Sequence, residues 1–246
     1  MEYGIFVNIF LDLAISLVSL VYTITLYNKY CDCNENNRPT QVSSMMIWAM
    51  VSICFIIDIT RQLVAISGNG TLQMQLYLIS LVPLTLVSLP IVFIVIYIVS
   101  GNRNVGIIVS SIFLVFGFLY IYTIIQFGGI NFVTTSWGSL AISNNEIANT
   151  IFLSGLFIVP TSLILGLLII ILFKRIPMFR KHKICLSLLS ISLVYDFLLL
   201  NSISQTGEMM VASKIFIFLG VVLSYLASFP PNLIESRYDP GIIVIE

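Results

Sequence analysis

Four ionisable side chains interrupt the apolar stretches of this sequence and could carry chemistry there: Asp12, Asp58, Arg61 and Asp196. A charged group at the centre of a bilayer costs about 2.5–3.5 kcal/mol on insertion scales, so it normally faces other helices and has a partner. Such a residue can bind a ligand or relay a proton, and it can also hold helices together. The four residues are therefore candidate ligand or proton sites.

Asp58 and Arg61 lie three residues apart, which places them on one face of a helix. A structural ion pair within that helix is the simplest interpretation, and a share in a ligand or ion site is the alternative. Asp12 follows Asn8 by four residues and shares its face. It lies either near the outer headgroups or among the helices.

Asp196 is the strongest single candidate, because it lies near the middle of its apolar stretch with no cation on the same helix. The nearest polar residues counted on that helix are Tyr195, which points elsewhere, and Asn201, more than one turn away. We expect Asp196 to face the bundle interior and to be neutral at pH 7. Its partner is then a group on another helix, water in a cavity between helices, or its own proton. The alternative is a purely structural hydrogen bond between helices.

The amino-acid composition indicates which class of protein holds these four ionisable residues. Of the 246 residues, 59% are hydrophobic and 9% are charged, whereas about a quarter of a soluble domain is charged. These values exclude an ordinary cytosolic protein and a disordered chain, and the 4 cysteines are too few for a disulfide scaffold.

Seven stretches are long and apolar enough to cross a bilayer as helices, which requires about 20 residues each. The sequence therefore predicts an all-α integral membrane protein, one domain over residues 1–246 with seven transmembrane helices. Pro83 and Pro90 in the third stretch and Pro160 in the fifth predict kinks that open a cavity between helices. The stretches lie near residues 4–27, 43–67, 73–100, 106–126, 149–173, 184–205 and 213–233.

The cations predict the orientation, because Lys and Arg in short loops stay on the cytoplasmic side. Arg61 and Lys214 are assigned to the outer half, and the loop between residues 127 and 148 contains no Lys or Arg. We therefore expect the N-terminus outside and the C-terminus in the cytoplasm. The cations assigned to the cytoplasmic side are Lys29, Arg38, Arg103, Lys174, Arg175, Arg180, Lys181, Lys183 and Arg237.

The sequence predicts no cofactor, no metal site and no catalytic residues, so an enzyme is not expected. The single histidine, His182, lies outside the membrane in a basic run that covers residues 174–183. Haem held by two histidines inside the bundle is therefore excluded. No phosphate-binding glycine motif occurs. Lys214 is expected at the outer start of the last stretch, where it could not form the buried Schiff base of a retinal protein.

The basic run is the candidate surface for a partner or for anionic lipid, although its role as a topology determinant is sufficient to explain it. Its candidate contact residues are Lys174, Arg175, Arg180, Lys181 and Lys183.

Three functions remain open at the level of sequence. The first is a sensory or receptor-like bundle in the cell membrane that signals to a separate partner. The topology resembles that of G-protein-coupled receptors and of seven-helix sensory modules of kinases, at the level of fold alone. The others are an accessory subunit of a larger membrane complex and a small-solute or ion carrier. Sparse interior charge and the absence of internal repeats weigh against the carrier. The expected partners are the lipid bilayer and a membrane or cytoplasmic protein, without nucleic acid.

Overall fold

The computed structural model describes residues 2–31, 38–175 and 177–229, and within them seven helical spans are long and apolar enough to cross a membrane. The predicted all-α class is confirmed, and the chain is a multi-pass membrane protein. Five of these spans are single helices, and the third and fifth spans are each divided into shorter helices. The helices are α1 (Glu2–Cys31), α2 (Arg38–Ile66), α3 (Gly70–Leu86), α4 (Ser88–Ser100), α5 (Arg103–Phe127), α6 (Glu146–Ile151), the π-helix η2 (Phe152–Ile158), α7 (Val159–Phe173), α8 (Met178–Ser202) and α9 (Gly207–Ser228).

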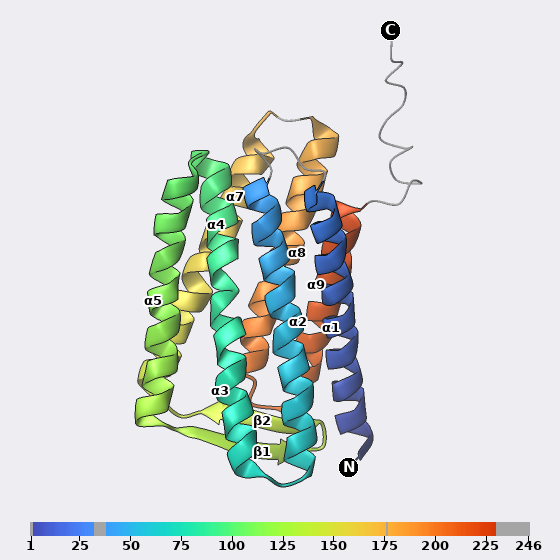
Figure 1. The fold of residues 1–246 in the computed structure, drawn as a ribbon, viewed down its shortest axis with the longest axis vertical. Coiled ribbons are helices and arrows are strands. Elements are labelled where there is room, and N and C mark those ends of the chain that lie inside the picture. The colour runs from blue at the N-terminus through green and yellow to red at the C-terminus, as the bar shows by residue number, and fades with distance from the viewer. Residues whose placement is uncertain (1, 32–37, 176, 230–246) are drawn as a thin grey trace.

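The spans form a closed bundle in which neighbours along the chain contact each other and α9 contacts α1 (Figure 1). The third span, α3 with α4, is the most enclosed, with 61% of its apolar window buried, and α4 contacts both α2 and α7. In α5 only 22% of that window is buried. The third span is therefore the central element, and α5 presents most of its surface to lipid.

The bundle has two chemically different ends. The hairpin end contains the start of α1, the α2–α3 turn and the connection between α5 and α6 (Figure 1). The basic end contains the α4–α5 turn, the α7–α8 connection and the start of α2. Alternate loops thus bring the predicted cations to one end, and the compartment that each end faces stays a prediction. The described cations of the basic end are Lys29, Arg38, Arg103, Lys174, Arg175, Lys181 and Lys183.

The prolines divide the third and fifth spans, as the sequence predicted. The third span changes from α3 to α4 at Val87, between Pro83 and Pro90. In the fifth span, Pro160 follows the π-helix η2 and has no N–H to offer the carbonyl of Leu156. The hydroxyl of Tyr195 on α8 donates to that carbonyl instead. A backbone group released by proline is thereby satisfied from a neighbouring helix, as a lipid environment requires.

The loop between residues 127 and 148 folds into an antiparallel hairpin that the sequence analysis did not predict. Its strands are β1 (Ile130–Thr135) and β2 (Gly138–Ser143), with Thr135 opposite Gly138 across a two-residue turn. The hairpin lies across one end of the bundle (Figure 1), where β2 contacts α1, α2 and α6. It is therefore part of the bundle's packing.

The last span begins at Gly207, six residues before the predicted start near residue 213. Thr206 caps this helix, because its side-chain oxygen accepts a hydrogen bond from the backbone N–H of Met209. Hydropathy misplaced the start because Gly207 and Glu208 are polar or small although they are already helical. The difference moves Lys214 two turns into the helix.

Candidate functional site

Lys214 is buried completely, with 0% of its surface exposed. The expectation that it lies at the outer start of its helix was wrong, because it is the eighth residue of α9. At a rise of about 1.5 Å per residue, its Cα lies roughly 10 Å inside the helix. A lysine at that depth needs an anionic partner to offset the loss of solvent.

Two carboxylates from two other helices supply this partner. The Nζ of Lys214 lies 2.6 Å from Oδ1 and 2.8 Å from Oδ2 of Asp12 on α1. It also lies 2.9 Å from Oδ2 of Asp58 on α2. Asp12 is 0% exposed, so of its two predicted positions the structure supports the one among the helices.

The predicted ion pair between Asp58 and Arg61 is confirmed. Oδ1 of Asp58 accepts from Nη2 of Arg61 at 2.6 Å and from Nε at 2.8 Å. The pair is not isolated within its helix, because the second oxygen of Asp58 binds Lys214. Asp12, Asp58, Arg61 and Lys214, the ion cluster, balance two negative charges with two positive charges and join α1, α2 and α9.

The hairpin is bound directly to this cluster through Ser139 of β2. Nη1 of Arg61 donates to the Ser139 carbonyl at 3.0 Å. Gln62 donates to the same carbonyl at 3.2 Å and accepts from the Ser139 N–H at 2.8 Å. The Ser139 hydroxyl accepts from the side chain of Gln73 on α3. Helical side chains therefore bind the N–H, the carbonyl and the hydroxyl of one hairpin residue.

Gly138, next to Ser139, allows this close approach. Its φ of +138° is a backbone conformation that residues with a side chain rarely adopt. A Cβ atom there would lie 2.7 Å from Oε1 of Gln62 and 2.9 Å from Nδ2 of Asn8. Glycine thus lets the hairpin backbone lie against side chains of α1 and α2, next to the ion cluster.

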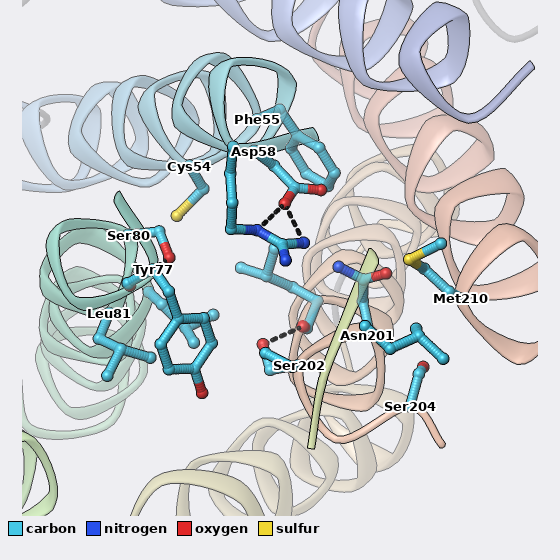
Figure 2. Close-up of a pocket in the computed structure, with 15 residues that line it drawn as sticks. Cys54, Phe55, Asp58, Tyr77, Ser80, Leu81, Asn201, Ser202, Ser204 and Met210 are labelled. Carbon is cyan, nitrogen blue, oxygen red and sulfur yellow. Dashed lines mark hydrogen bonds and ion pairs between the residues drawn. The ribbon is translucent and has the colours of Figure 1, made fainter. Parts of the chain in front are cut away.

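A cavity of about 60 Å³ lies beside Asp58 and Arg61 (Figure 2). Tyr77 and Ser80 of α3 line one side, and Asn201 at the end of α8 lines another. The side-chain oxygen of Asn201 is buried and has no hydrogen-bond partner within the described part of the chain. A space of this size is large enough for water, since one molecule requires at least about 10–15 Å³ of probe volume.

Asp196 does not line this cavity and lies at the contact between α7 and α8. Its Oδ1 accepts from the hydroxyl of Thr161 on α7 at 2.6 Å, so of the three expected partners the structure supplies a group on another helix. Its Oδ2 accepts from the hydroxyl of Ser192 at 3.0 Å. The expectation that no nearby polar group lies on its own helix was wrong, because Ser192 precedes it by one turn.

One residue of the basic run, Lys181, contributes a structural hydrogen bond. Nζ of Lys181 donates to the carbonyl of Leu172 at 2.7 Å, in the last turn of α7. A cation there satisfies a free carbonyl and complements the helix dipole. Lys174, Arg175 and Lys183 are exposed. The side chain of Arg180 lies outside the described residues, and a partner or lipid role for this run stays a prediction.

Lys214 is the site residue that the sequence analysis missed, although charge balance could have indicated it. The apolar stretches contain the three acidic residues Asp12, Asp58 and Asp196 but, besides Lys214, only one cation, Arg61. An uncompensated carboxylate in a membrane is expensive, so a second cation within the spans was to be expected. Counting the charges of all spans together would have directed attention to α9.

The fold and this site define the class, a seven-span membrane protein whose first, second and last helices share a buried ion cluster beneath an ordered hairpin. Comparison of the chain with protein-family models, curated proteins and solved structures found no match.

Proposed function

We propose that this protein is a receptor-like sensor of the cell membrane, in which the hairpin end receives a signal and the basic end passes it to a separate partner. One observation carries the proposal: Arg61 binds the hairpin carbonyl of Ser139 and the cluster carboxylate of Asp58 with the same guanidinium group. A displacement of the hairpin would therefore change the partners of a buried charge.

The distribution of cations supports the orientation that this function needs. The described Lys and Arg residues outside the ion cluster belong to the basic end. Since Lys and Arg in short loops remain on the cytoplasmic side, the hairpin end faces outward and the C-terminus lies in the cytoplasm. The hairpin is then the part of the bundle that an external ligand meets first.

The cluster provides a route from the hairpin to the helices. Arg61 holds Asp58, and Asp58 shares Lys214 with Asp12, so a change at Arg61 alters the charge balance among α1, α2 and α9. Towards the other end, Tyr22 of α1 donates to the Ser224 carbonyl of α9 at 3.0 Å. The pair α1 and α9 therefore extends from the cluster towards the basic end.

The exposed cations of the basic run provide the proposed contact with a cytoplasmic partner. Lys174 and Arg175 follow the last turn of α7, and Lys183 lies on α8. Lys183 also lines a cleft with Leu26 and Lys29 of α1. A shift of α1 would therefore alter the surroundings of a residue on this surface.

The orientation is tested with single cysteines in a chain whose 4 native cysteines are replaced. We expect an impermeant maleimide to label Asn131→Cys on the hairpin in intact cells. Arg175→Cys at the basic end should react only after lysis. Both residues are exposed in the structure, so the reverse pattern would invert the orientation and remove the proposed direction of signalling.

The coupling is tested with an environment-sensitive fluorophore on Lys183→Cys in the same background. Gly138→Val should displace the hairpin, because its side chain would collide with Gln62 and Asn8, and the emission at position 183 should shift. The control is Thr134→Ala, an exposed hairpin position, which should leave the emission unchanged. Displacement of the hairpin without a spectral change would contradict the sensor and favour the accessory subunit.

A further inference from the structure

A groove of about 650 Å³ lies at the basic end, away from the ion cluster. It is bordered by the end of α1, the start of α2, the α4 helix and the start of α5. This volume lies within the range of ordinary small-molecule sites, roughly 300–1,000 Å³. None of the residues that line the groove takes part in the ion cluster or binds the hairpin.

The polar end of the groove is basic. Arg38 is the first residue of α2 and Arg103 is the first residue of α5, so both lie at the same end of the bundle. Neither arginine forms a salt bridge within the part of the chain that the structure describes, and no acidic residue is among those lining the groove. The guanidinium of Arg38 lies 5.8 Å from the ring centre of Tyr30, which also lines the groove. These groups form a site for an anion.

The remainder of the groove is mostly apolar, with Ser43 and Ser110 as its polar members, and opens towards lipid. Met46 follows Arg38 by two helical turns on the same face of α2, and Ile107 follows Arg103 by one turn on α5. Met46 is 43% exposed and Ile107 is 46% exposed, although both line the groove. Phe93 of α4 forms the wall between them. The apolar strip therefore runs from the arginines towards the centre of the bilayer.

We propose that this groove binds an anionic phospholipid of the leaflet at the basic end. The phosphate lies between Arg38 and Arg103, and an acyl chain lies along Met46, Phe93 and Ile107. A free phosphate would use only the two arginines, whereas a neutral lipid would leave their charges without an anion. The pairing of a basic end with an apolar wall matches a molecule that has both parts.

The test is native mass spectrometry of the full chain in detergent, with phosphatidylglycerol and phosphatidylcholine of identical acyl chains. We expect the protein to retain phosphatidylglycerol in preference to phosphatidylcholine. Arg38→Gln with Arg103→Gln should reduce the preference about thirtyfold, the effect expected for two basic residues near an anionic surface. The control, Lys29→Gln, removes a cation of the same end that does not line the groove and should change the preference less than twofold.

Two further measurements keep the test decisive. Val42→Glu places a carboxylate one turn from Arg38, at a position that is 37% exposed and lines the groove. It should abolish the preference while both arginines remain. Glycerol 3-phosphate, the headgroup without chains, should not displace the phospholipid at equal concentration. Equal losses in the double variant and in the Lys29→Gln control, no headgroup preference, or equal binding of glycerol 3-phosphate would each overturn the proposal.

Discussion

Two buried carboxylates, Asp12 and Asp196, show how differently the same side chain is accommodated in one bundle. Asp12 is fully enclosed and is held by the ammonium group of Lys214. Asp196 is only partly buried and is held by the hydroxyls of Thr161 and Ser192. The position of a residue along its own helix therefore does not reveal its role, because the neighbouring helix supplies either a charge or a hydroxyl.

The two contacts also differ in the sequence separation of the residues that they join. The bond between Asp12 and Lys214 joins residues 202 positions apart and closes the bundle between α1 and α9. The bond between Thr161 and Asp196 joins consecutive helices, 35 positions apart. We therefore expect loss of the first contact to open the bundle, and loss of the second to loosen a pair of helices that the chain already keeps together.

Removal of Lys214 should have the largest effect. Lys214→Met leaves Asp12 enclosed without a cation, and breaking a buried ion pair in this way costs about 3–5 kcal/mol of unfolding free energy. Denaturant unfolding in mixed micelles measures the loss. Lys183→Met, an exposed lysine of α8, is the control and should cost less than about 0.5 kcal/mol. Equal stabilities of the two variants would show that the cluster does not hold the bundle.

The pair Asp58 and Arg61 should show compensation. Asp58→Leu leaves an excess cation and Arg61→Met leaves an excess carboxylate, so each single variant should lose roughly 3 kcal/mol. The double variant keeps the neutral pair of Asp12 and Lys214 and should be more stable than either single variant. The same unfolding measurement decides it, and a double variant no better than the worse single one would refute the coupling.

The comparison between Asp12 and Asp196 becomes sharper with the same substitution at both. Asp12→Asn removes a charge that faces Lys214 and should cost about 1.5–3 kcal/mol, the range for hydrogen bonds to charged groups. Asp196→Asn keeps an oxygen acceptor for Thr161 and should cost less than about 1 kcal/mol. Unfolding of both variants under identical conditions tests the difference. A larger loss at Asp196 would reverse the assignment of roles.

Tyr195→Phe should cost less than the substitutions at Lys214, Asp58, Arg61 or Asp12. The change leaves the Leu156 carbonyl without the hydroxyl donor that replaces the missing N–H of Pro160. One lost hydrogen bond of this kind costs about 1 kcal/mol. Tyr122→Phe, at a position that is 58% exposed, is the matched control, and its unfolding free energy should equal that of the wild type. If the two variants are equally stable, Tyr195 does not support the break in the fifth span.

Local sequence was sufficient for the helices and for one contact of the site. Seven apolar stretches predict seven spans, because a chain in lipid must satisfy its backbone within each segment. The spacing of Asp58 and Arg61 predicts their contact, since residues three apart share one helix face. The start of α9 was misplaced, because a cap at Thr206 and a polar first turn carry no hydropathy signal.

The sequence by itself therefore determined that this protein crosses the membrane seven times, which loops carry its cations, and that Asp58 and Arg61 pair within one helix. Only the tertiary structure decided that Lys214 meets Asp12 and Asp58, and that Ser139 of the hairpin binds Arg61. The physical reason is the distance along the chain over which a sequence pattern carries information. Hydropathy and helical periodicity act over a few turns of one segment, whereas these contacts depend on how separate helices pack and turn towards each other.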